Sequence, residues 1–102
     1  MEEMRSIIAY KLINLGFDTR NEGFELWVIA IILNHRKNYK KIEYLYTDIA
    51  IEAGTTRNRV ERNLRFARKK ADKKIKESYN IEYKITNKSF LELSKYICYG
   101  GK

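Results

Sequence analysis

Residues 47–60 read Thr-Asp-Ile-Ala-Ile-Glu-Ala-Gly-Thr-Thr-Arg-Asn-Arg-Val, and this stretch decides the fold. It predicts a short helix over 47–53 that stops at Gly54, with a second helix starting a few residues later. The small Ala50 lets two helices cross closely, glycine accommodates a sharp turn, and Val60, facing back, locks the pair. The stretch therefore predicts a helix-turn-helix, although a purely structural helical hairpin can carry the same residue types.

The second helix is amphipathic. Thr55 or Thr56 can cap its start, and apolar residues then recur every three or four positions for about five turns. These apolar residues are Val60, Leu64, Ala67, Ala71 and Ile75. At 100° per residue the opposite face is strongly basic. It carries Asn58, Arg62, Arg65, Lys69, Lys73 and Lys76, with Arg57, Glu61 and Arg68 on one flank and Arg59 on the other.

The positive charge of the chain is concentrated on this helix. The protein has 102 residues and a formal net charge of +8. Residues 57–76 contain ten Lys/Arg and two Asp/Glu, so the remainder of the chain is neutral overall. Lys and Arg clustered on one face are typical of nucleic-acid binding, whereas a merely solvated face is the alternative explanation.

The rest of the chain predicts further helices. Apolar residues at helical spacing predict helices over about 3–15 and 21–34, the second one apolar nearly all round and therefore central in the bundle. Residues 79–85 alternate between apolar and polar, which predicts a short extended segment, and Asn87 is expected to cap a last helix. With no proline and 33% charged residues, the composition favours helices. We expect one all-α domain over 1–102, a compact bundle of five or six helices.

Part of the helix pair resembles a known family. The matching residues are Leu45-Tyr46-Thr47-Asp48-Ile49-Ala50, Thr55-Thr56, Arg59-Val60-Glu61-Arg62 and Arg65, with weaker agreement at Ile7-Ile8, Leu15-Gly16 and Gly23-Phe24. At these positions the chain is similar to the C-terminal DNA-binding effector domain of the bacterial response regulator that initiates sporulation. The resemblance implies an all-helical fold whose helix from about Thr56 enters the major groove. It also implies that Arg59, Glu61, Arg62 and Arg65 contact bases or phosphates.

The chain departs from this family at several positions. Arg57 and Asn58 replace smaller residues at the start of the recognition helix, and Phe66 replaces a polar residue. The preferred DNA sequence is therefore expected to differ. The family joins this domain to a phosphate-accepting receiver domain, and we expect this chain to act without one.

The recognition helix is expected over about Thr56–Lys76. Arginine can pair with guanine, asparagine with adenine, and glutamate can accept a hydrogen bond from cytosine, while lysines farther along the helix are expected to meet phosphates. The predicted DNA-binding residues are Thr56, Arg57, Asn58, Arg59, Glu61, Arg62, Arg65, Lys69 and Lys73. These residues predict a transcription regulator that binds double-stranded DNA in a sequence-specific manner.

The main alternative is an interaction protein that pairs with another transcription regulator and modulates it through its last helix. The apolar residues of that helix exceed the obvious needs of a small core, so they predict a homodimer or tandem binding on DNA. These residues are Phe90, Leu93, Tyr96 and Ile97. Simple core packing explains them equally well.

Other classes of function lack the residues they need. We find no nucleophile and base at a recognisable spacing and no phosphate-binding glycine loop, so no enzyme, cofactor or small-molecule substrate is expected. Cys98 and His35 are the only residues of their types, which predicts no internal disulfide and no zinc site. The longest apolar run, residues 26–33, is far shorter than the roughly 20 residues of a membrane span. A basic helix that lies on a membrane is disfavoured, because the apolar face of this helix is needed for packing in the core. We expect a cytoplasmic protein.

Overall fold

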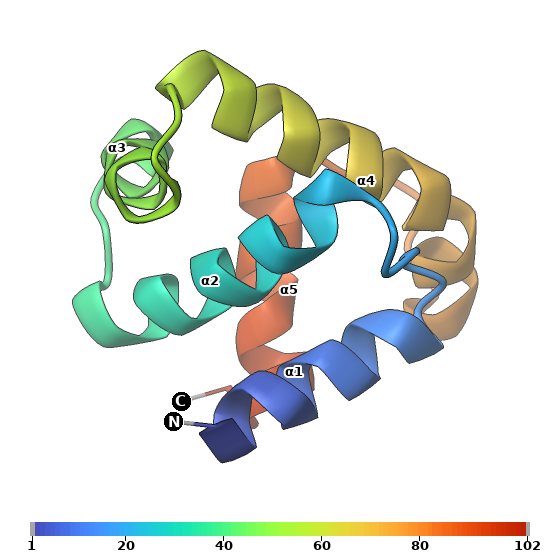
Figure 1. Ribbon diagram of the computed structural model, residues 1–102. Helices are drawn as coiled ribbons and strands as arrows, with labels where there is room; N and C mark the ends of the chain where they lie inside the picture. Colours follow the sequence, from blue (N-terminus) through green and yellow to red (C-terminus); the bar gives the residue numbers. More distant parts are fainter. Residues whose placement is uncertain (1, 102) are drawn as a thin grey trace.

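The computed structural model describes residues 2–101, and this part of the chain forms a bundle of five α-helices (Figure 1). The helices are α1 (Glu2–Asn14), α2 (Glu22–Lys37), α3 (Ile42–Ala53), α4 (Arg57–Tyr79) and α5 (Asn87–Tyr99). Residues 2–101 contain no β-strand. The predicted all-α bundle is confirmed, and it has five helices.

Helix α2 lies at the centre of the bundle and packs against each of the other four helices. The side chain of Trp27 is fully buried, with its ring edge-on to Phe90 of α5 and the ring centroids 5.1 Å apart. When neighbouring helices cover several sides of a helix that is apolar nearly all round, the largest area of apolar surface is removed from water. The predicted central position of this helix is confirmed.

Helix α4 crosses α2 at close range. A Cβ atom at Gly23 would lie 2.1 Å from the backbone oxygen of Asn63 and 2.7 Å from the Cβ of Ala67, so only glycine fits there. Farther along α2, Trp27 donates its Nε1–H to the carbonyl oxygen of Leu64 at 2.9 Å. These two contacts fix α4 against α2 and determine which of its faces points to solvent.

The predicted bounds of the third helix are wrong at its start. Helix α3 begins at Ile42, five residues before the predicted start at Thr47. Its first turns contain Leu45, which is 1% exposed, and Tyr46, which is 8% exposed. Tertiary burial of these side chains supports a helical segment that lacks a strong local start signal.

The predicted extended segment over 79–85 is also wrong. Helix α4 continues through Tyr79, and its C-cap residue Asn80 has the left-handed backbone angles φ 57° and ψ 44°. Of the alternating residues, Ile81 and Ile85 turn toward the core, whereas Tyr79 and Tyr83 are exposed. The two inward residues are four positions apart, and Tyr83 between them is exposed, so the period of two in the sequence does not correspond to one buried strand face.

The sequence predicts Asn87 as the cap of the last helix, and this prediction is wrong. Helix α5 is capped by Thr86. The Thr86 hydroxyl accepts a hydrogen bond from the backbone N–H of Ser89 at 3.1 Å, and the Thr86 N–H donates to the Ser89 hydroxyl at 2.8 Å. The two bonds form a reciprocal capping box. Asn87 is instead buried, and its side chain binds groups on other helices.

The contact surface predicted on the last helix is smaller than expected. Phe90 is 1% exposed and packs against Trp27 and Phe17, because α5 crosses the centre of the bundle at this residue. Leu93 and Ile97 are half-buried against the core, and Tyr96 is 70% exposed. Phe90 is thus a core residue, and a contact between copies of the chain on DNA stays a prediction.

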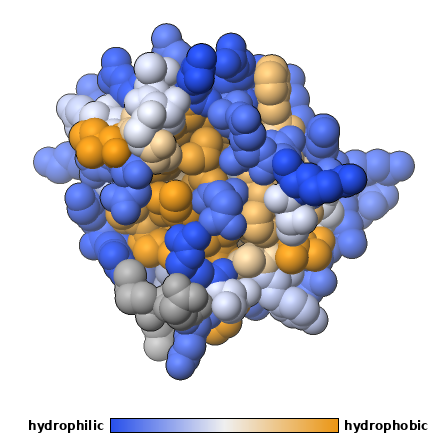
Figure 2. Space-filling model, viewed as in Figure 1, coloured by the Kyte–Doolittle hydropathy of each residue, from blue (hydrophilic) through white to orange (hydrophobic). Residues whose placement is uncertain are grey.

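The face of the molecule shown in Figure 2 is largely hydrophilic, with apolar side chains gathered over α1 and α2. Helix α1 contributes the exposed Ile7, Tyr10 and Ile13. Within residues 2–101, no helix combines the length and apolar character needed to cross a bilayer. The exposed part of α4, by contrast, is dominated by cations, and its large exposed apolar residues are Phe66 and the terminal Tyr79.

Candidate nucleic-acid interface

A three-residue turn, Gly54 to Thr56, joins α3 to α4. Gly54 has φ 68°, a left-handed conformation that carries no steric penalty for glycine, and its N–H bonds back to the carbonyl of Ala50. The Thr56 hydroxyl accepts a hydrogen bond from the backbone N–H of Arg59 at 3.2 Å and so caps α4. The predictions that Gly54 ends one helix and that a threonine caps the next are confirmed.

The inner face of α4 is apolar along its whole length. The five predicted residues, Val60, Leu64, Ala67, Ala71 and Ile75, are each no more than 3% exposed. This face packs against α2 and α3, which leaves the opposite face open to solvent. The amphipathic pattern predicted for this helix is confirmed.

The open face contains the predicted DNA-binding residues. Seven are exposed, namely Thr56, Arg57, Asn58, Arg59, Arg62, Lys69 and Lys73, and Glu61 and Arg65 are half-buried. Within residues 2–101, none of the five exposed cations of this set forms an ion pair. One side of α4 therefore presents a row of positive charges that the protein itself does not neutralise.

Glu61 and Arg65 bind each other across one turn of α4. The Nε of Arg65 lies 2.9 Å from Glu61 Oε2, and its Nη2 lies 3.4 Å from Oε1. The hydrogen bonds from this guanidinium to the carboxylate raise the pKa of Arg65. The guanidinium also lies 5.1 Å from the ring centroid of Phe66. Because a partly exposed ion pair at this spacing is screened by solvent and contributes little to stability, either group can exchange its partner for a DNA group at small cost.

The predicted position of Arg68 on the flank of the basic face is wrong. Arg68 is 3% exposed. Its Nη1 donates to both carboxylate oxygens of Asp72, at 2.8 and 2.7 Å, and its Nε donates to Asn87 Oδ1 at 3.0 Å. Arg68 lies at the border between the two faces of α4, and the start of α5 covers that border. The charge is therefore buried with a carboxylate beside it instead of facing solvent.

A polar network around Asn87 joins three helices. The Asn87 Nδ2 donates to Tyr46 Oη on α3 at 3.1 Å, while its Oδ1 accepts from Arg68 on α4. Burial raises the pKa of the Tyr46 hydroxyl, which keeps it in the neutral form. The side chains of Tyr46, Arg68 and Asn87 thus link α3 and α4 to the start of α5 on the side of α4 away from its open face.

Two hollows lie beside α4. The first, of about 230 Å³, lies next to the start of α2 and is lined by Arg59 and Arg62 together with the acidic Glu22. There Asn63 donates to Glu22 Oε2 at 3.3 Å. The second hollow, the α4–α5 cleft, has a volume of about 360 Å³. It lies on the α5 side of α4, between residues 61–69 and residues 84–88. The exposed face of α4 is therefore bordered by the acidic Glu22 on one side and by Lys84 and Lys88 on the other.

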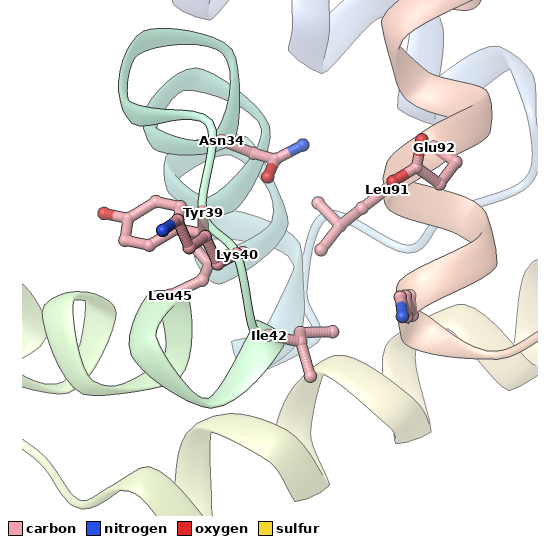
Figure 3. Close-up of a pocket in the computed structure, with 8 residues that line it drawn as sticks. Asn34, Tyr39, Lys40, Ile42, Leu45, Leu91 and Glu92 are labelled. Atoms are coloured by element: carbon pink, nitrogen blue, oxygen red, sulfur yellow. The ribbon is translucent and has the colours of Figure 1, made fainter.

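A third, smaller hollow lies where the end of α2, the start of α3 and α5 meet. Figure 3 shows Leu91 of α5 pointing across this space toward Asn34 and Ile42. Its volume is about 30 Å³, room for about one water molecule. This hollow is too small for an organic ligand.

Other reactive side chains are not gathered into a site in the described part of the chain. Within residues 2–101, no group of three or more His, Cys, Asp or Glu could bind a metal ion. Burial raises the pKa of the Cys98 thiol to about 11, so it is protonated at neutral pH. His35 is exposed and stacks in parallel on Tyr99, with ring centroids 3.6 Å apart. The row of cations on α4 is therefore the strongest candidate for a functional surface.

Comparison with known proteins gives no match to a protein-family model, to a curated protein or to a solved structure. Three properties of this region indicate its function: the short turn between α3 and α4, the fixed orientation of α4 against α2, and the uncompensated charge on the open face of α4.

Proposed function

We propose that this protein is a transcription regulator that binds duplex DNA in a sequence-specific manner. In this proposal α3, the turn at Gly54 and α4 form a helix-turn-helix, and α4 enters the major groove. The observation that carries the proposal is the row of unpaired cations on the open face of a helix that directly follows a three-residue turn. The resemblance of residues 45–65 to the effector domain of the sporulation-initiation response regulator supports the same assignment.

The dimensions and chemistry of α4 suit this role. The major groove of B-DNA is about 12 Å wide and admits one α-helix. In helix-turn-helix proteins the first turns of the recognition helix reach base edges, and in α4 these turns carry the exposed Asn58, Arg59 and Arg62. Lys69 and Lys73, two to three turns farther along, are placed for phosphates. Phosphate contacts position a protein on DNA, whereas base contacts select the sequence.

The first test is the selection of bound sites from a random duplex library, followed by titration of the selected duplex at several salt concentrations. We expect an enriched sequence motif, and an affinity whose logarithm falls linearly with log salt by about 0.9 per phosphate contacted. The Lys69→Ala/Lys73→Ala double variant should bind selected and random duplexes more weakly by the same factor. The control is the Lys11→Gln/Lys95→Gln variant, which removes the same amount of charge as the double variant but from α1 and the second half of α5. This control should bind like the wild type.

A flat response to salt would contradict DNA binding by this face. Uniform weak binding without an enriched motif would instead favour the alternative of an interaction protein whose basic face is secondary. Wild-type affinity of the Lys69→Ala/Lys73→Ala variant would show that this part of α4 faces solvent in the complex.

A second test separates reading of bases from contact with the backbone, and it uses Glu61 and Arg62. If Arg62 pairs with guanine, Arg62→Ala should cost about 1–3 kcal/mol of binding free energy and relax the preference at one base position. If Glu61 accepts a hydrogen bond from cytosine, Glu61→Ala should blunt discrimination at that base pair. The measurement is the affinity of each variant for the selected site and for all its single-base variants.

The ion pair between Glu61 and Arg65 requires a control. Loss of the Glu61 carboxylate frees the Arg65 guanidinium and removes a negative charge, and both effects would tighten binding to every duplex. Comparison of Glu61→Ala with Glu61→Ala/Arg65→Ala isolates the contribution of the freed arginine. A uniform shift for Glu61→Ala and Arg62→Ala, with all base preferences intact, would show that other residues read the bases.

A further inference from the structure

The α4–α5 cleft has an unusual lining for a hollow on a small domain. It is bounded by the middle of α4 on one side and by the end of the α4–α5 loop and the first turn of α5 on the other. Its lining includes Arg65, Arg68, Lys69, Lys84 and Lys88, with Glu61 as the single acidic residue. Segments separated by about twenty residues in the sequence thus bring their cations to one place.

The charge of this lining is only partly neutralised. Glu61 is bound by Arg65, and the buried Arg68 is bound by Asp72. Lys69, Lys84 and Lys88 are exposed, and none of them forms an ion pair or a side-chain hydrogen bond within residues 2–101. Three unpaired ammonium groups around one hollow repel each other unless an anion lies between them.

The first turn of α5, which lines the cleft, also has free backbone donors. The capping box uses the N–H groups of Thr86 and Ser89, whereas those of Asn87 and Lys88 have no acceptor within residues 2–101. Free N–H groups in the first turn of a helix favour an anion, and here they adjoin the lysine side chains. The ligand class that this combination of ammonium groups and backbone N–H donors suits best is a phosphate.

We infer that the α4–α5 cleft binds a phosphate of the DNA strand that borders the major groove on the α5 side of α4. This inference rests on the proposed function, because a helix in the major groove has a phosphodiester strand along each side. The hollow on the other side of α4 contains the carboxylate of Glu22, so the two strands meet different charges. Lys84 and Lys88 are therefore backbone-contacting residues that extend the DNA-binding surface beyond α4.

The test compares the Lys84→Gln/Lys88→Gln variant with the wild type and with the Lys11→Gln/Lys95→Gln control, on the selected and random duplexes. Loss of two phosphate contacts should make the fall of log affinity with log salt less steep by about 1.8. This change corresponds to roughly 60-fold weaker binding at about 0.1 M salt. The loss should be equal for both duplexes, with base preferences unchanged. A methylphosphonate, which is uncharged, should weaken wild-type binding at the contacted phosphate and leave the variant unaffected there.

The outcomes separate failure of the inference from failure of the proposed function. If the wild type binds DNA with a strong salt dependence and the Lys84→Gln/Lys88→Gln variant equals the control, the cleft does not contact the strand and the inference is wrong. If inorganic phosphate at constant ionic strength saturates the amide signal of Lys88 while the variant keeps its DNA affinity, the cleft belongs to a free phosphate-bearing ligand instead. If the wild type binds no duplex, the proposed function fails, and the inference fails with it. Matched circular dichroism and thermal unfolding of all variants will show that each one is folded.

Discussion

Replacement of Arg68 by alanine is expected to lower the free energy of unfolding by about 3–5 kcal/mol, the cost of breaking a buried ion pair from one side. The guanidinium is 3% exposed and donates to Asp72 and to Asn87. Its loss leaves a carboxylate and an amide oxygen without their donors, and it disconnects α4 from the start of α5. This one change therefore removes a large fraction of a domain's net stability, which is about 5–15 kcal/mol.

Urea unfolding followed by circular dichroism measures this effect, with Lys69→Ala as the matched control. Lys69 is the next residue on the same helix, but it is exposed and unpaired, so its loss should change stability by no more than about 0.5 kcal/mol. The Arg68→Met/Asp72→Ala variant removes both charges together and should recover much of the stability, because no buried charge is then left unpaired. Equal stability of Arg68→Ala and Lys69→Ala would mean that the network around Asn87 does not support the fold.

Replacement of Trp27 by alanine should be about as damaging, with a loss of about 3–5 kcal/mol. The indole is fully buried at the centre of the bundle, where it contacts Phe17 and Phe90 edge-on. It also donates a hydrogen bond to the carbonyl of Leu64 on α4. Truncation therefore leaves a large cavity at the point where α2 supports α4.

The Trp27→Phe variant separates packing from the hydrogen bond. A phenyl ring keeps most of the aromatic contacts, so this variant should lose on the order of 1–2 kcal/mol, from the missing Nε1–H donor and a smaller cavity. Chemical unfolding monitored by circular dichroism suits all three proteins, because Trp27 is the only tryptophan and fluorescence would be lost. A loss below about 1 kcal/mol for Trp27→Ala would contradict the central position of this side chain.

Features that depend on neighbouring residues were predictable from the sequence. The stop at Gly54 and the amphipathic pattern of α4 are present as predicted, and Thr56 is the one of the two candidate threonines that caps α4. The central place of α2 was predictable as well, because a helix that is apolar on nearly every side has no face suited to water. These features follow from backbone chemistry within one or two turns, or from the composition of one helix.

Features that depend on distant partners were not predictable. A helical projection of α4 predicts a basic side and an apolar side, but it does not show which part of the border between them α5 covers. The projection therefore places Arg68 on the flank of the basic face, whereas the side chain is buried. The side chain of Asn87 suits a helix cap, yet it bonds instead to groups on α3 and α4. For Phe90 the sequence leaves a contact surface and core packing equally open, because its burial depends on where α5 crosses α2.

The sequence by itself determined an all-α protein with a basic helix after a tight turn, because helix periodicity, capping and charge are properties of local stretches. The tertiary structure decided which charges remain free. It buries Arg68 beside Asp72, pairs Glu61 with Arg65, and places residues 84–88 next to the middle of α4. The physical reason is that the free energy of a charged side chain depends on the groups that surround it in space, and packing brings those groups from distant parts of the chain.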